Sequence, residues 1–317
     1  MSEEMSLEDI PGVGRVTAKK LRGAGVFTVR QLALYTAEEL ALSINMDPSV
    51  AERILSHARS MVGLKPEIMT AKERKVLRTK QSFLTTGVRA IDDLLGGGLE
   101  PQSIYEFAGE FGTGKTQICH QLAVTVQLMP NRGGVDGKAM YIDTEGTFSP
   151  ERIESIAKRF ELDPDVALDN VLHCRPYNVD MLEEFVKGSL IKYVEEGVKL
   201  IVVDSIIALY RAEFKGREML ARRQQRINYL LDWLKRIGRV YDTYNVITNQ
   251  VMDKPIGFGP LVKIPTGGNI IAHTSTHRLI LRKSGEVWKI EVLDSPRITR
   301  GLSVPFKITE RGVEDIG

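Results

Sequence analysis

The strongest chemical signal in the chain is a glycine-rich loop of the form G-x-x-x-x-G-K-[ST]. Its residues, which we take as contacts to ATP, are Gly109, Glu110, Phe111, Gly112, Thr113, Gly114, Lys115 and Thr116, with Gln117 directly after them. Glycines let the backbone curl so that several N–H groups point at a β-phosphate. Lys115 should reach the β- and γ-phosphates, and the Thr116 hydroxyl should ligate Mg²⁺. A chance glycine turn is the weaker alternative, because the loop lies between a predicted strand and a predicted helix.

Three other polar residues stand at the ends of apolar, strand-like runs. Asp204 ends KLIVVD, where a phosphate-loop ATPase needs an acid for the magnesium shell. Glu145 in YIDTEGTF is the candidate that orients the attacking water, with Asp143 as the alternative. Gln250 in VITNQ could sense the γ-phosphate and pass its state along the chain. Because the carboxyl ends of parallel strands share one edge of a sheet, these side chains and Lys115 predict an ATPase.

Near the N-terminus, IPGVG at residues 10–14 has the form of a helix-hairpin-helix turn. Such a hairpin presents backbone N–H groups to a nucleic-acid phosphate without reading bases. Four basic residues cluster beside it: Arg15, Lys19, Lys20 and Arg22. Contact with a protein is the open alternative, because such turns serve both purposes.

Two later segments also favour an anionic partner. Residues 211–226 hold six basic residues against two acids, whereas a solvated helix face would show more balanced charge. Residues 251–268 form an expected long loop without periodicity, rich in Gly and Pro. A basic loop with an apolar wedge predicts a sequence-tolerant site for single-stranded DNA. Its side chains of interest are Lys254, Phe258 and Lys263.

The composition sets only broad limits. Apolar residues make up 43% and charged residues 26% of 317 residues, typical of a globular chain with a substantial core. Lys and Arg number 43 against 41 Asp and Glu, so a nucleic-acid surface must come from local clustering. Cys119 and Cys174 lack metal-type spacing, which predicts a reducing compartment. No apolar run approaches about 18 residues, so we expect a soluble intracellular protein with no membrane partner.

Three regions follow from the pattern of apolar residues. Residues 1–62 carry short amphipathic helices that begin at capping residues, which predicts an all-helical module. Residues 63–80 lose this pattern, and KERKVLRTK within them is either a basic arm in a linker or a solvated charge run. Residues 81–317 alternate strands and helices and then turn all-β, which predicts an α/β core with a mostly parallel sheet.

At this point the chain resembles the RadA family of archaeal recombinases and their eukaryotic relatives, within the RecA superfamily. The resemblance rests on GEFGTGKTQICHQLAVTVQL, YIDTEGTFSPERI, LIVVDS, YRAEFKGRE, VITNQV and GGNIIAH, in this order, and on the hairpin module before them. It covers essentially the whole chain and implies a RecA-like phosphate-loop ATPase core. It further implies a helical filament on single-stranded DNA, with ATP and Mg²⁺ between protomers, that pairs and exchanges strands with double-stranded DNA.

The resemblance also carries residue roles. Glu145 would activate water, and Arg152 in SPERI would pack on adenine. The first DNA-binding segment would hold Arg211, Arg217 and Arg223. Residues 251–268 would form the second DNA-binding segment, with Gly267, Gly268, Asn269 and His273 at its end. His273 would couple DNA to ATP, although a lone histidine is more often a core residue.

Four departures from the family pattern stand out. Ser149 replaces a common arginine, and the second DNA-binding segment looks slightly short. The protomer-docking motif usually begins with Phe, and here its nearest match is IMTA, from Ile68 to Ala71. After DSP the usual acid is missing, and the chain reads Arg297-Ile298-Thr299-Arg300. With Asp294, Arg300 or alternatively Arg297 would contact the ATP of the neighbouring protomer; both arginines facing solvent is the other interpretation.

Two other functions compete with a recombinase. An accessory paralogue would bind DNA and recombinase without exchanging strands, but the intact ATP residues and both DNA segments favour the enzyme. A phosphate-loop kinase for a metabolite would need an acceptor pocket and lid, which the sequence does not suggest. The resemblance implies further copies of the chain, in a filament or ring, and recombinase paralogues and loading mediators as partners. It places the protein with DNA, in the cytoplasm if archaeal or in the nucleus if eukaryotic.

Overall fold

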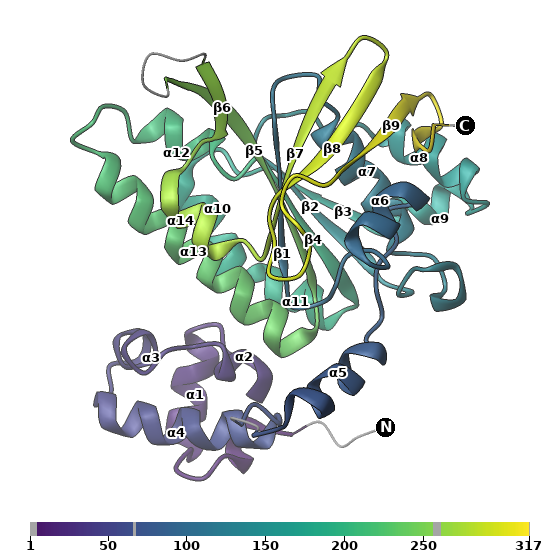
Figure 1. The fold of residues 1–317 in the computed structure, drawn as a ribbon. Coiled ribbons are helices and arrows are strands. Elements are labelled where there is room, and N and C mark those ends of the chain that lie inside the picture. Colours follow the sequence, from purple (N-terminus) through teal and green to yellow (C-terminus); the bar gives the residue numbers. More distant parts are fainter. Residues whose placement is uncertain (1–4, 66–67, 256–260, 317) are drawn as a thin grey trace. The chain divides into compact units, whose positions relative to one another are not determined.

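The computed structural model describes residues 5–65, 68–255 and 261–316 (Figure 1). The chain divides into two compact units, residues 1–80 and 81–317. No helix in the described ranges is long and apolar enough to cross a membrane.

The first unit is all-helical. Its helices are η1 (Leu7–Asp9), α1 (Arg15–Gly23), α2 (Val29–Ala33), α3 (Ala37–Ile44), α4 (Pro48–Met61) and α5 (Ala71–Thr79). Ser6, Thr28 and Thr36 open η1, α2 and α3 with capping boxes, in which the cap and the third helical residue satisfy each other's backbone N–H groups. The apolar faces of these helices meet in a buried core that includes Leu7, Leu21, Leu32, Leu40 and Leu55.

Helix α5 corrects the expectation of a patternless stretch between residues 63 and 80. Thr70 and Glu73 form a capping box at its start, so local capping supports a helix where apolar periodicity is weak. None of the residues of α5 is buried, and Val76 and Leu77 are 48% and 44% exposed. The sequence pattern failed here because it detects helices mainly by the face they bury.

The second unit is built on one mixed sheet with strand order β10-β9-β8-β7-β1-β5-β4-β2-β3, and β6 pairs with β5. The strands from β7 to β3 in this order are parallel neighbours, and the others are antiparallel. The bounds are β1 Ile104–Gly109, β2 Lys138–Asp143, β3 Val171–Cys174, β4 Val198–Asp204, β5 Tyr244–Pro255, β6 Leu261–Pro265, β7 His277–Ser284, β8 Val287–Asp294, β9 Ser303–Thr309 and β10 Gly312–Glu314. The predicted fold class, a mostly parallel sheet, is confirmed.

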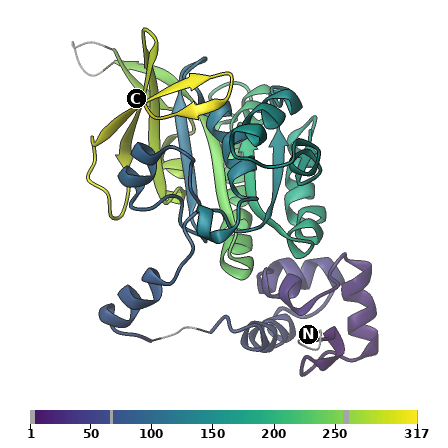
Figure 2. The same ribbon diagram turned by 90° about the vertical axis from the view of Figure 1, so that its right-hand side faces the viewer.

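Helices cover both faces of this sheet (Figures 1 and 2). They are α6 (Arg89–Leu95), α7 (Lys115–Thr125), η2 (Pro130–Arg132), α8 (Pro150–Arg159), α9 (Pro164–Asp169), α10 (Val179–Lys187), α11 (Ser189–Glu195), α12 (Ala208–Glu213), α13 (Leu220–Tyr241) and α14 (Gly268–Thr274). The apolar core on the α7 side includes Tyr105 and Phe107 of β1. The parallel strands therefore end at one edge, where β1 meets α7 through the phosphate loop.

The segment from residue 251 to 268 is more regular than its composition predicts. β5 continues to Pro255 and pairs antiparallel with β6, with Val251 opposite Pro265. Both prolines stand at strand ends, where the missing N–H costs the sheet little. The expectation of an irregular loop is therefore wrong for these flanks, and Phe258 lies outside the described residues.

Candidate nucleotide site and DNA-binding surfaces

The phosphate loop connects β1 to α7, as its motif predicts. Gly114 has φ of 93° and precedes α7, whose first turn lacks a side-chain cap, which leaves backbone N–H groups for a phosphate. A Cβ at Gly109 would lie 2.7 Å from the Leu281 carbonyl oxygen, so only glycine fits there. The Lys115 ammonium donates to the carbonyls of Gly109 and Glu110 at 3.0 and 2.8 Å. Burial lowers the pKa of Lys115, against the raising effect of nearby carboxylates, so an anionic phosphate is a favourable partner for it.

Asp204 is the centre of a buried hydroxyl cluster. Its Oδ2 accepts hydrogen bonds from Thr116 Oγ1 at 2.8 Å and Tyr141 Oη at 2.7 Å, and its Oδ1 accepts one from Thr248 Oγ1. A carboxylate beside a threonine hydroxyl is the oxygen donor set that Mg²⁺ prefers, so these residues fit the ion. Sequence reasoning found Thr116 and Asp204 but missed Tyr141 and Thr248, whose alternation along their strands points them to the same face.

Glu145 lies in a chain of side chains that starts on the first DNA-binding segment. Arg211 Nη1 donates to Gln250 Oε1 at 3.1 Å, and Gln250 Nε2 donates to Glu145 Oε1 at 3.1 Å. Ser205 Oγ donates to the same carboxylate oxygen at 2.6 Å. The predicted water-orienting acid, the predicted γ-phosphate sensor and a predicted DNA contact are thus brought together, and Ser205 is an addition that the sequence did not suggest.

Asp143 has a different task from Glu145. Its carboxylate accepts hydrogen bonds from four successive backbone N–H groups, those of residues 145–148, at 2.7 to 3.2 Å. Burial by itself would raise the pKa of Asp143, but these N–H groups outweigh it and lower the pKa. The side chain is 2% exposed and fixes the backbone that carries Glu145. This geometry supports a structural role for Asp143.

Arg152 is held against the β9–β10 turn. Its Nε donates to Gln117 Oε1 at 2.8 Å, and its Nη atoms donate to the carbonyls of Thr309 and Glu310 at 3.0 and 2.7 Å. Gln117 follows the phosphate loop, so the guanidinium lies close to the nucleotide side of α7. The predicted stacking on adenine stays a prediction.

The hairpin of the first unit has the expected turn. Gly12 has φ of 90°, Val13 N donates to Ile10 O at 2.9 Å, and α1 begins at Arg15 without a side-chain cap. Lys19 and Lys20 are exposed, as is Arg15. Arg22 differs from the predicted cluster, because both its Nη atoms donate to Glu8 at 2.7 Å. Glu8 and Arg22 lie on either side of the turn, so their pairing was hidden from the linear sequence.

The basic residues of the first DNA-binding segment lie on different elements. Arg211 is on α12, Arg217 is exposed between α12 and α13, and Arg223 is on α13 with Nη1 donating to Phe214 O at 3.5 Å. Phe214 is buried under α13, and the guanidinium of Arg226 lies 5.6 Å from its ring. The segment is therefore anchored at its middle and exposed at Arg217.

The second DNA-binding segment ends at α14. Gly267, with φ of 88°, caps this helix, Gly268 begins it, and Asn269 and His273 are exposed on it. The interpretation of His273 as a core residue is therefore wrong. Lys263 on β6 forms an ion pair with Glu110 of the phosphate loop. Lys254 belongs to β5, and its side chain lies outside the described part of the structure.

Both units of the chain are similar to known protein families. The family model named Rad51 matches residues 77–316, and a model of the SAM-like helix-hairpin-helix tandem matches residues 4–60. The chain is 43% identical over 316 residues to the DNA repair and recombination protein RadA of Ignicoccus hospitalis, which covers 98% of this chain and 95% of that protein.

This chain belongs to the Rad51 family. Membership confirms the predicted resemblance, the RecA-like core and the preceding helix-hairpin-helix module. It also makes the chain a DNA-dependent ATPase and recombinase of DNA repair, as predicted.

Two segments of this Rad51-family chain were predicted from the sequence to contact a second protomer. Ile68 is fully exposed, at 102% of its reference area, and Ala71 is exposed at the start of α5. In the segment after β8, Arg300 is exposed. Arg297 is 19% exposed, with Nε 3.6 Å from Glu100 Oε2 and its guanidinium 5.9 Å from the Phe83 ring. Arg297 is therefore engaged within its own core, whereas Arg300 is exposed.

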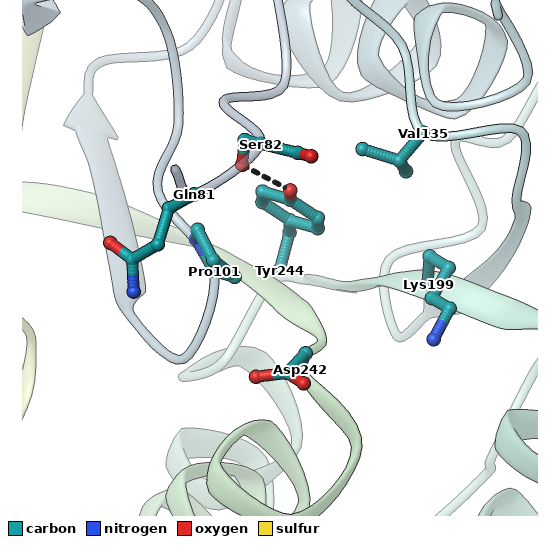
Figure 3. Close-up of a pocket in the computed structure, with 7 residues that line it drawn as sticks. All are labelled: Gln81, Ser82, Pro101, Val135, Lys199, Asp242 and Tyr244. Carbon is teal, nitrogen blue, oxygen red and sulfur yellow. Dashed lines mark hydrogen bonds between the residues drawn. The ribbon is translucent and has the colours of Figure 1, made fainter. Parts of the chain in front are cut away.

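A cavity of about 310 Å³ lies away from the phosphate loop (Figure 3). Pro101, Lys199 and Tyr244 line it close to the starts of β1, β4 and β5, so it belongs to the opposite edge of the sheet. Tyr244 Oη closes one side by donating to Ser82 O at 2.6 Å. This cavity is distinct from the nucleotide site.

Proposed function

We propose that this chain couples ATP hydrolysis to DNA strand exchange through the hydrogen-bonded chain Arg211–Gln250–Glu145. The single observation that carries the proposal is this chain of two 3.1 Å contacts, which links a segment that would bind DNA to the acid that would orient water. A DNA phosphate would compete with Gln250 for Arg211, because an anionic phosphate binds a guanidinium more strongly than a neutral carboxamide oxygen does. Gln250 would then be free to turn toward the γ-phosphate.

The phosphate loop and Asp204 hold the substrate in this mechanism. Lys115 would exchange its carbonyl contacts for the β- and γ-phosphates, and the N–H groups before α7 would cradle the β-phosphate. Thr116 and Asp204 would hold Mg²⁺, which when bound neutralises charge on the phosphate oxygens. Glu145 would orient the attacking water and accept its proton. Tyr141, Thr248 and Ser205 position the two carboxylates through their hydroxyl groups.

Assembly would place ATP between protomers. β8 runs antiparallel to β7, so Asp294 and the segment after it lie at the edge opposite the chain's own phosphate loop. Contact of Arg300 with ATP therefore needs another protomer, in which it would act as an arginine finger worth up to ~10³-fold in turnover. Ile68 and Ala71 would dock on the neighbouring core, and Ile68→Glu should prevent assembly in a sedimentation measurement.

Mixed assemblies test Arg300. Arg300→Ala and Lys115→Ala should each be inactive alone. In a mixture, the Lys115→Ala protomer would supply its arginine to the intact site of its neighbour, so hydrolysis should recover. Failure to recover in co-assembled protomers would remove Arg300 from the ATP site.

The DNA partners follow from the basic segments. We propose single-stranded DNA as the filament core and double-stranded DNA as the second substrate, with paralogues and loading mediators as further partners. Because the similar RadA comes from Ignicoccus hospitalis, an archaeal cytoplasm with its DNA is the location that we propose.

A strand-exchange assay with purified protein, ATP and Mg²⁺ tests the function. We expect ATP-dependent filaments on single-stranded DNA in negative-stain images and transfer of a labelled strand from a homologous duplex. Filament binding without transfer would instead identify an accessory paralogue.

A further inference from the structure

Three consecutive residues in the middle of β5 contact three different partners. Thr248 donates to Asp204, and Gln250 donates to Glu145 at 3.1 Å, so both face the nucleotide site. Asn249 lies between them and faces the other side of the sheet, because side chains alternate along a strand. Asn249 is fully buried and takes no part in the mechanism described above.

The carboxamide of Asn249 is completely hydrogen-bonded. Its Nδ2 donates to Glu106 Oε1 at 2.7 Å and to Thr266 O at 2.8 Å, and its Oδ1 accepts from Thr266 Oγ1 at 2.6 Å. Glu106 is itself fully buried, and its Oε2 accepts from Arg278 Nε at 2.5 Å. Polar groups in such surroundings rigidify the structure when all are paired and are costly when one is not.

Thr266 joins this network to the second DNA-binding segment. Its backbone N–H donates to Gln250 O at 2.8 Å, so Thr266 is bonded to two adjacent residues of β5. It is 6% exposed and directly precedes Gly267, which caps α14 with Asn269 and His273. Through Thr266, the start of α14 is thus hydrogen-bonded to Gln250, the proposed γ-phosphate sensor.

We propose that Asn249 and Thr266 are positioning residues that couple the γ-phosphate sensor to α14. When Gln250 shifts on binding ATP, the three bonds that Thr266 makes to Asn249 and Gln250 oblige the start of α14 to shift with it. DNA held by Asn269 and His273 acts on Gln250 by the same route. The inference rests on the proposed roles of Gln250 and of the second DNA-binding segment.

The test measures how much the binding of ATPγS and the binding of DNA strengthen each other. The dissociation constant for a fluorescent oligothymidine is measured with and without ATPγS, and that for ATPγS with and without the oligomer. The two ratios give one coupling factor, which must be equal in both directions. A merely structural residue changes individual affinities but leaves this ratio intact.

Thr266→Val keeps the side-chain shape and removes the hydroxyl, which leaves Asn249 Oδ1 without its partner. We expect the coupling factor to fall by about fivefold or more in both directions, and Thr266→Ser to restore it to within about twofold. The matched control is Thr125→Val, at a fully buried threonine whose hydroxyl donates to Thr85 O at 2.8 Å. It should lose stability and keep the coupling factor.

Thermal unfolding midpoints establish that each variant is folded, and Thr266→Ala replaces Thr266→Val if the latter does not fold. Coupling retained in Thr266→Val and Thr266→Ala, with normal coupling in the intact protein, would overturn the inference alone. Absence of coupling in the intact protein would overturn the proposed function together with it.

Discussion

The basic side chains of the hairpin and those that follow β4 differ in what they contact. Lys19 and Lys20 are exposed on α1, and the side chain of neither forms a hydrogen bond or ion pair with another residue that the structure describes. Arg211 is also exposed, but it donates to Gln250, which donates to Glu145. A cation that contacts only solvent can add affinity for DNA, whereas one bonded to the catalytic groups can also change the rate of hydrolysis. We expect the two regions to affect different measured quantities.

The largest effect should come from Glu145, at the far end of the hydrogen-bonded chain that begins at Arg211. Glu145→Gln keeps the shape of the side chain and removes the carboxylate that we propose orients water. We expect ATP and DNA binding to be retained and DNA-stimulated hydrolysis to slow by roughly 10²-fold or more. Undiminished turnover would move the role to another group, and Asp143→Asn is the variant to compare next.

A smaller effect should come from Arg211→Ala. In the proposed mechanism Arg211 holds Gln250 until DNA takes the guanidinium. Without Arg211 the DNA-free rate should therefore rise, and stimulation by DNA, the ratio of the rates with and without saturating DNA, should fall by roughly tenfold. Arg217→Ala and Arg223→Ala should also weaken stimulation through their DNA contacts. Steady-state ATPase rates across a DNA titration measure this, and full stimulation in all three variants would refute the assignment of the first DNA-binding segment.

The smallest effect on ATP hydrolysis should come from the helix-hairpin-helix turn of the first unit. Replacing both Lys19 and Lys20 by Ala should weaken DNA binding to a similar extent for all sequences. The slope of log K against log salt for single-stranded DNA should decrease by about 1.4, from about 0.7 per phosphate contact. An unchanged slope in fluorescence anisotropy titrations would favour a protein partner for the hairpin.

The sequence predicted which residues of the candidate nucleotide site lie together, because the signals for that site are local. Eight adjacent residues specify the phosphate loop, and strand ends on one edge predict where Glu145, Asp204 and Gln250 meet. The supporting hydroxyls of Tyr141, Thr248 and Ser205 could not be assigned, because their contacts depend on which strands are neighbours. That order, β5-β4-β2, differs from the order in sequence.

The candidate DNA-binding surfaces were predicted less well, because their structure depends on which side chains form ion pairs and which strands are neighbours. Arg22 contributes to the expected basic cluster in sequence, but Glu8 neutralises it across the turn. Helix α5 begins at a capping box and buries no side chain, so periodicity misses it. The flanks of residues 251–268 are paired strands, because β6 pairs antiparallel with β5, which Gly and Pro content does not reveal.

The most direct test of the account is a double-mutant cycle on Arg211 and Gln250. Stimulation by DNA, the ratio of kcat with and without saturating DNA, is measured at saturating ATP for the intact protein, Arg211→Ala, Gln250→Ala and the double variant. If Arg211 acts on Glu145 through Gln250, the double variant should be stimulated no less than Gln250→Ala alone, since residues that act as a unit are not additive. Two losses that multiply in the double variant would show independent action and would contradict the account.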